Sequence, residues 1–184
     1  MGREDILAQV EALFAEKGYA GTSMADIAAA VGLKKASLYS HFTAKSDVYL
    51  GVIGRVHRRL LDEVESLAAQ NFDPEDHLRT QMRQLSASGP VSLFRFTLFP
   101  PQDLLADVMP IFADFDRRFR NAISGALRNH LSSEADEQRV KSLTDIYIDL
   151  MNGLLSVQKF VPEEVFSDRL NANFDLFWEL VEAS

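Results

Sequence analysis

Apolar residues recur every three or four positions along almost the whole chain, which is the spacing of one face of an α-helix. Glycine and proline are sparse, at 9 and 6 of 184 residues, and a strand-like alternation of apolar and other residues occurs only at 93–99. Because no partner strand is visible for that segment, we interpret it as a short helix or an extended connector. The spacing therefore predicts an all-α fold.

The N-terminal part predicts three short helices around glycine turns. The first carries an apolar stripe that includes Ile6 and Val10, and it is expected to end at Gly18, which follows a basic last turn. Ser23 and Asp26 have the spacing of a capping box, so a second helix is expected to begin there and to end at Gly32. A third helix over 34–41 follows at once. Two short helices around a glycine turn indicate a helix-turn-helix motif.

A much longer helix is expected from Ala44 to about Gln70, with Thr43 as its cap and one apolar face. It would join the N-terminal head to a C-terminal helical bundle. Gly, Pro and Ser clusters divide that bundle into expected helices over 74–87, 104–131, 135–160 and 162–182. We predict two domains, a head over residues 1–47 and a body over residues 48–184.

The charge is distributed unevenly between these two parts. Residues 1–60 hold eight Lys or Arg and six Asp or Glu, a net charge of +2, although the whole chain carries −8. The rest of the chain therefore carries −10. This asymmetry is typical of a head that faces nucleic acid on an acidic body, although an ordinary solvated acidic surface explains it too.

The order and spacing of about a dozen head residues resemble the DNA-binding head of the TetR family of transcriptional regulators. The resemblance covers about 45 residues and is only architectural beyond residue 50. It implies a dimeric, effector-responsive regulator, by family habit a repressor. The residues that carry it are Ile6-Leu7-Ala8-Gln9-Val10, Leu13-Phe14, Gly18-Tyr19, Thr22-Ser23, Asp26-Ile27-Ala28, Val31-Gly32-Leu33, Leu38-Tyr39, His41-Phe42 and Lys45.

Two sets of residues are expected to contact double-stranded operator DNA. A helix that enters the major groove needs a small polar face toward the bases, while Leu38 and Phe42 are expected to point back to the core. That face is supplied by Lys34, Lys35, Ser37 and Ser40. The resemblance adds contacts to phosphates from Thr22, Ser23, Tyr39, His41 and Lys45. Lys34 departs from the family pattern, because a lysine cannot cap a helix where a small polar residue is usual.

The last two expected helices are apolar on two faces, so each should be buried on two faces. We assign one face to the core of the chain and the other to a homodimer interface, as the family uses, although a thick monomer core remains open. The interface is predicted from a heptad-like seam. It comprises Val140, Leu143, Leu150, Leu154, Phe166, Leu170, Phe174 and Phe177, and the second apolar set includes Ile146, Met151, Leu155, Leu176, Trp178 and Leu180.

A surplus of aromatic and methionine side chains in the middle of the chain predicts a pocket for a small, mostly apolar effector. Core packing is the alternative role for each of them. The predicted lining is Met82, Phe94, Phe96, Phe99, Phe112, Phe115, Tyr147 and Met151.

Several classes of protein are disfavoured by what the sequence contains. The chain has no cysteine, its four histidines lack ligand spacing, and no paired Glu-x-x-His motif of a di-iron site occurs, so we expect no enzyme, metal or cofactor. No bilayer-length apolar run or secretion signal is visible, which favours the cytoplasm over a membrane. The alternative function is a helical-bundle small-molecule-binding or scaffold protein that does not bind DNA.

Overall fold

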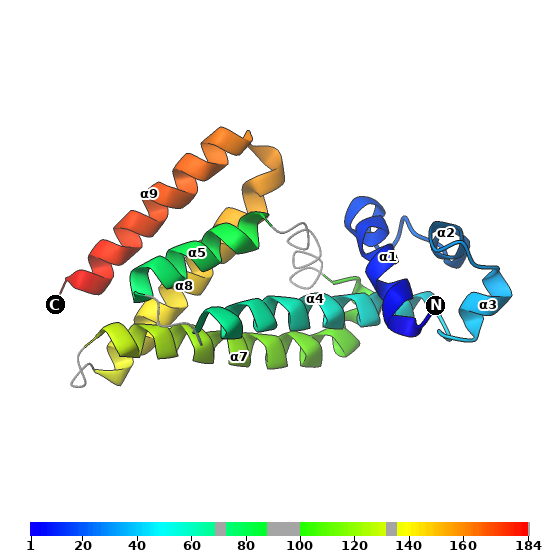
Figure 1. The fold of residues 1–184 in the computed structure, drawn as a ribbon, viewed down its shortest axis with the longest axis horizontal. Coiled ribbons are helices and arrows are strands. Elements are labelled where there is room, and N and C mark those ends of the chain that lie inside the picture. The colour runs from blue at the N-terminus through cyan, green and yellow to red at the C-terminus, as the bar shows by residue number, and fades with distance from the viewer. Residues whose placement is uncertain (69–72, 88–99, 132–135, 184) are drawn as a thin grey trace. The chain divides into compact units, whose positions relative to one another are not determined.

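The computed structural model describes residues 1–68, 73–87, 100–131 and 136–183, and within these ranges the chain is helical and contains no strand (Figure 1). This confirms the all-α prediction, and each expected helix lies within a few residues of its predicted bounds. The 93–99 segment lies outside the described residues. The elements are α1 (Arg3–Lys17), α2 (Met24–Ala30), α3 (Lys35–Tyr39), α4 (Lys45–Ala68), α5 (Pro74–Ala87), η1 (Gln102–Leu104), α7 (Leu105–His130), α8 (Glu137–Val157), η2 (Gln158–Phe160) and α9 (Glu163–Glu182). No helix in these ranges is long and apolar enough to cross a membrane.

The chain packs as two compact units. The head unit comprises Met1–Arg59 and Pro90–Phe115, and the body unit comprises Leu60–Gly89 and Asp116–Ser184. Helices α4 and α7 each contribute residues to both units. These units describe packing, and the functional division at residues 47 and 48 stays a prediction.

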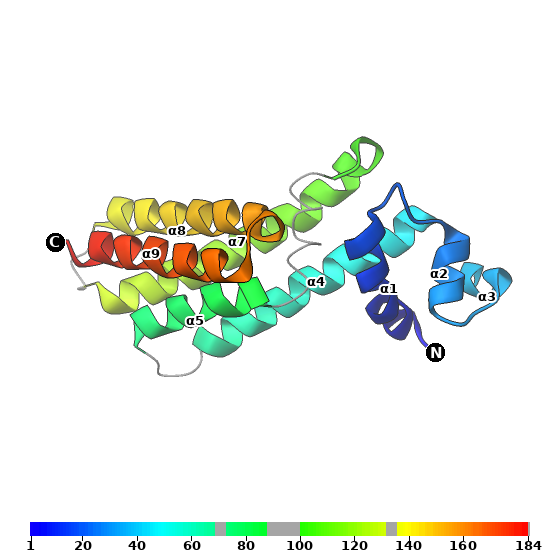
Figure 2. The ribbon, with the colours of Figure 1, turned by 90° about the horizontal axis from the view of Figure 1, so that it is seen from above.

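Local signals place the short helices of the head unit (Figure 2). The Ser23 hydroxyl accepts the Asp26 N–H at 3.1 Å, and the Asp26 carboxylate accepts the Ser23 N–H at 2.8 Å, which confirms the predicted capping box. Gly18 and Gly32 have positive φ values of 70° and 65°, so the turns after α1 and α2 use a conformation that favours glycine. Together these features fix α2 and α3 as a helix-turn-helix pair.

The start of α4 differs from the expectation that Thr43 caps it. The helix begins at Lys45, and the Thr43 N–H donates to the Asp47 carboxylate at 3.1 Å. An acidic residue in the first turn therefore accepts an amide hydrogen from the preceding turn, which also suits the positive end of the helix dipole.

The seam that was predicted as the dimer interface forms the core of a single chain instead. Helices α8 and α9 pack side by side in the body unit (Figure 2), and seven of the eight seam residues are buried there, with Leu150 half-buried. The seven buried side chains have little surface left for a partner, and only Leu150 is still partly accessible. The second apolar set is divided: Ile146, Leu176 and Leu180 are exposed, whereas Met151, Leu155 and Trp178 are buried.

Candidate nucleic-acid interface

Helix α3 presents an amphipathic surface in which the polar side faces solvent. Leu38 is fully buried on its inner side, and Phe42 follows it into the same core, as expected. The Lys34 backbone occupies the N-cap position but its side chain makes no capping hydrogen bond, as the departure from the family pattern predicted. The side chains of Lys34, Lys35, Ser37 and Ser40 are exposed. The face that would meet base edges is therefore available.

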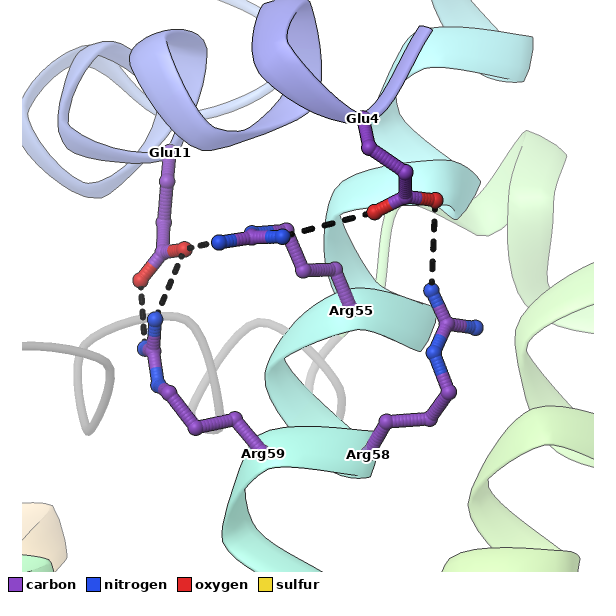
Figure 3. A network of polar contacts seen from close by, with 5 residues as sticks. All are labelled: Glu4, Glu11, Arg55, Arg58 and Arg59. Atoms are coloured by element: carbon purple, nitrogen blue, oxygen red, sulfur yellow. Dashed lines mark hydrogen bonds and ion pairs between the residues drawn. The ribbon is translucent and has the colours of Figure 1, made fainter.

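The cations of the head unit differ in their freedom to bind an anion. Three arginines of α4 pair with two glutamates of α1, and Figure 3 shows this network. Arg59 donates two hydrogen bonds, of 3.2 and 2.6 Å, to Glu11, while Arg55 and Arg58 lie 3.3 and 3.6 Å from the oxygens of Glu4. The network ties α1 to α4, and its two carboxylates offset most of the charge of the three arginines.

Within the described part of the chain, neither Lys34 nor Lys35 forms an ion pair. The excess positive charge of the head therefore remains unneutralised at the start of α3. This is the end of a recognition helix that contacts bases in helix-turn-helix proteins.

Lys45 is positioned by Tyr19. Its Nζ donates to the Tyr19 carbonyl at 2.7 Å and lies 4.0 Å from the centre of the Tyr19 ring. An ammonium has three donors, so this contact leaves two for a phosphate. Lys45 thus has a structural contact that its sequence position did not reveal, and it remains half-exposed.

Thr22 and Ser23 differ in their accessibility. The Thr22 side chain is 2% exposed and its hydroxyl donates to the Gly18 carbonyl at 2.8 Å, so in this structure it stabilises the turn after α1. The assignment of that hydroxyl to a phosphate is not supported by this geometry. Ser23 is exposed at the N-terminus of α2, although its hydroxyl is shared with Asp26.

Arg3 holds the turn between α3 and α4, a role that sequence reasoning missed. Its guanidinium lies 4.3 Å from the centre of the Phe42 ring and donates to the His41 carbonyl at 2.9 Å and to Asp47 at 2.6 Å. The hydrogen bond from Arg3 holds the pKa of Asp47 below its usual value. This turn carries His41, and Tyr39 precedes it with an exposed ring. The expected phosphate contacts therefore lie on a turn that is fixed from α1.

The predicted effector residues are divided between the two units and the part of the chain that the structure does not describe. Met82, Tyr147 and Met151 are buried in the body unit, whereas Phe112 and Phe115 belong to the head unit, and Phe94, Phe96 and Phe99 lie outside the described residues. The predicted grouping stays a prediction. A different hollow, a polar cleft of about 610 Å³, lies between α7 and α8 and is lined by residues that include Arg120, Arg128 and Lys141.

The family comparison concerns the head. Residues 6–52 match the family described as bacterial regulatory proteins, tetR family. Over 47 residues, 26% of this chain, the sequence is 49% identical to the biofilm operon icaADBC HTH-type negative transcriptional regulator IcaR of Staphylococcus aureus (strain Newman). The match spans only 25% of that regulator's length.

Solved structures resemble the fold over nearly the whole chain. A transcriptional regulator of the TerR/AcrR family from Aquifex aeolicus VF5 is 25% identical, with a TM-score of 0.71 over 95% of this chain and 98% of that one. AibR, crystallised in complex with isovaleryl coenzyme A and operator DNA, is 19% identical, with a TM-score of 0.64 over 95% and 96% of the two chains.

Proposed function

We propose that this chain, a member of the tetR family of bacterial regulatory proteins through its residues 6–52, is a dimeric transcriptional repressor that a small, mostly apolar effector releases from its operator. The observation that carries the proposal is the exposed polar face of α3, where Lys34 and Lys35 have no described carboxylate partner. Repression is proposed because the curated relative is a negative regulator.

Dimerisation is proposed through the exposed face of α8 and α9. Ile146 on α8 and Leu176 and Leu180 on α9 are large apolar side chains that one chain leaves in water. A side chain added at Gly153 of α8 would meet open space, so a second helix could approach closely there. Two copies related by a twofold axis would present two recognition helices about 34 to 36 Å apart or somewhat further, to a near-palindromic site.

The release mechanism is proposed to act through α4. This helix begins with Lys45 in the head unit and continues into the body unit, so a displacement of one part of the helix is transmitted to the other. We place the effector in the body unit beside Met82, Tyr147 and Met151. AibR, with its bound coenzyme A ester and operator, is an example of this fold carrying both ligands. A coupling free energy of about 1 to 3 kcal/mol between effector and operator is the usual range.

The direct test is selection of bound duplexes from a random pool by the full-length protein. We expect a near-palindromic consensus. Replacing Lys34 or Ser37 with alanine should change the preferred base at one position of each half-site, because a good side-chain contact discriminates by about 1 to 3 kcal/mol. An unselective pool, with no enriched sequence, would contradict the proposed function. Unchanged preferences in both variants would contradict the base-reading assignment alone.

Lys45→Ala is expected to weaken binding to every duplex alike. Loss of one phosphate contact should reduce the slope of log affinity against log salt by about 0.9. Lys141→Ala, which removes one exposed charge from α8, is the control and should leave the slope unchanged. Because Lys45 also binds the Tyr19 carbonyl, thermal melting must show that the head remains folded. An unaltered slope for Lys45→Ala would refute its phosphate contact.

A further inference from the structure

The core of the body unit contains a small group of buried polar side chains on two facing helices. His77 and Gln81 lie one turn apart on α5, and Thr144 and Tyr147 lie one turn apart on α8. The other buried residues of these two helices are apolar. A few polar groups that converge within an apolar core are typical of a small-molecule site.

Gln81 is held in one orientation by Tyr147. The Tyr147 hydroxyl lies 3.0 Å from Gln81 Oε1 and 2.9 Å from the Leu78 carbonyl oxygen, and these two acceptors share its single proton. The Gln81 side chain is 1% exposed, so this contact directs its amide nitrogen into the core. Within the described part of the chain Gln81 Nε2 has no hydrogen-bond partner.

An amide nitrogen in this position is unfavourable for folding. A buried donor that has lost water without gaining an acceptor destabilises the folded state, whereas an apolar side chain of the same length would pack without that penalty. Tyr147 does not need Gln81, because the Leu78 carbonyl is within its reach. An unsatisfied donor in a native core calls for an explanation, and a ligand that supplies the acceptor is one.

The surroundings of Gln81 define the kind of ligand that fits. Met82 follows it on α5, and Met151 lies one turn beyond Tyr147 on α8, both buried. Methionine side chains adjust to irregular apolar shapes. The buried polar residues of the described chain include no Lys, Arg, Asp or Glu, so a buried ionic group on the ligand would lack a counter-charge from such a residue.

We propose that Gln81 Nε2 donates a hydrogen bond to an uncharged acceptor oxygen of the effector, and that the effector is a largely apolar ketone, ester or lactone. This inference rests on the proposed function, because it names the chemistry of the effector. It assigns Gln81 as the residue that determines specificity and Tyr147 as the residue that positions its amide.

The test compares ligands that differ only in the carbonyl. The full-length protein is titrated calorimetrically with acetophenone, butyrophenone and hexanophenone and with ethylbenzene, butylbenzene and hexylbenzene, in which a methylene replaces the carbonyl. In the wild type the best ketone should bind more tightly than its hydrocarbon by about tenfold or more. For Gln81→Met, the affinity for the ketone should fall to the affinity for the hydrocarbon. The affinity for the hydrocarbon should stay within about twofold of the wild-type value.

Stability provides a second readout. Gln81→Met should raise the melting temperature without ligand by about 2 to 4 °C, because it removes an unsatisfied buried donor. Gln138→Met, at an exposed position of α8, should change neither the melting temperature nor the ketone preference. If Gln81 had only a structural role, Gln81→Met would have a lower melting temperature and would lose affinity for ketone and hydrocarbon equally. That result would overturn the assignment. Failure of every ketone to bind the wild type more tightly than its hydrocarbon would overturn it as well.

Duplex binding separates this inference from the proposed function. Gln81→Met should bind the selected duplex as the wild type does, but about tenfold more butyrophenone should be needed to weaken that binding. If the wild type binds ketones through Gln81 yet selects no duplex, the regulator proposal fails and the Gln81 assignment stands. If it selects a duplex but shows no ketone preference, the Gln81 assignment alone fails.

Discussion

Leu176→Glu is expected to convert the protein into a folded monomer and to lower its affinity for a palindromic duplex by roughly two orders of magnitude or more. The Leu176 side chain is 62% exposed in one chain, so a carboxylate there remains hydrated and leaves the fold of the monomer intact. In the proposed dimer the same carboxylate would be buried in an apolar interface, which is strongly unfavourable. A monomer engages only one half-site at a time. Sedimentation gives the mass, and titration of the duplex gives the affinity.

Two controls isolate the proposed interface. Leu105→Glu changes another exposed leucine, in the head unit and outside the α8–α9 face, and should leave the dimer intact. Gly153→Phe should also give monomers, while Gly125→Phe on α7, where an added side chain likewise meets open space, should not. A normal dimer mass for both Leu176→Glu and Gly153→Phe would show that another surface holds the two chains together.

The outcome for Phe174 should differ from that for Leu176, although both residues lie on α9. Phe174 is fully buried. The centre of its ring lies 6.1 Å from the centre of the Trp178 ring, and the Arg79 guanidinium stacks on its face. A glutamate there should unfold the body unit rather than separate two intact chains. Periodicity identified Phe174 and its neighbours as one face of a helix, but it does not say which partner covers a face. Because α8 and α9 are apolar on two sides, the sequence left the choice open, and the prediction assigned to the interface a set of residues that is mostly covered within one chain.

Features that depend on a few neighbouring residues were predictable. The reciprocal contacts of Ser23 and Asp26, the positive φ of Gly32 and the inward side of Leu38 all follow from local spacing. The apolar spacing similarly predicted the order of the long helices, whose ends differ from expectation by a few residues.

Features that depend on distant residues were not predictable. The pairs that tie α1 to α4 join distant residues, and Arg59 and Glu11, for example, are 48 positions apart. A surface charge has many partners within reach in a sequence, and only the folded geometry selects one. The hydrogen bond from Lys45 to the Tyr19 carbonyl could not be predicted for the same reason. Every residue has a backbone carbonyl, and the sequence does not show which of them lacks a backbone donor. Sequence reasoning therefore found the residues of the α3 surface but not the contacts that hold them in place.

The protein is expected to lose about 2 kcal/mol of unfolding free energy between pH 7 and pH 5 through His57 alone. His57 lies on α4 within the head unit, is 3% exposed and stacks on Phe115 with ring centres 4.5 Å apart. Burial lowers its pKa from 6.5 to about 4, although a hydrogen bond with the Ile111 backbone partly opposes that shift. Below pH 6.5 the unfolded chain therefore binds a proton that the folded chain still excludes. The contribution of neutral His57 to the unfolding free energy is complete above pH 6.5 and is lost progressively as the pH falls toward 4.

His57→Phe should flatten this pH dependence, because phenylalanine keeps a ring against Phe115 and has no proton to gain. The variant also loses the contact with the Ile111 backbone, but that loss is the same at every pH and leaves the slope unaltered. Chemical denaturation at pH 7, 6 and 5 measures how the unfolding free energy depends on pH. Most carboxylates are still ionised in this range, so their titration contributes little to that dependence. Parallel stability profiles for the wild type and His57→Phe would mean that the folded protein accepts the proton as readily as the unfolded chain. The His57–Phe115 contact between α4 and α7 would then have to be open to water, in conflict with the packing of the head unit.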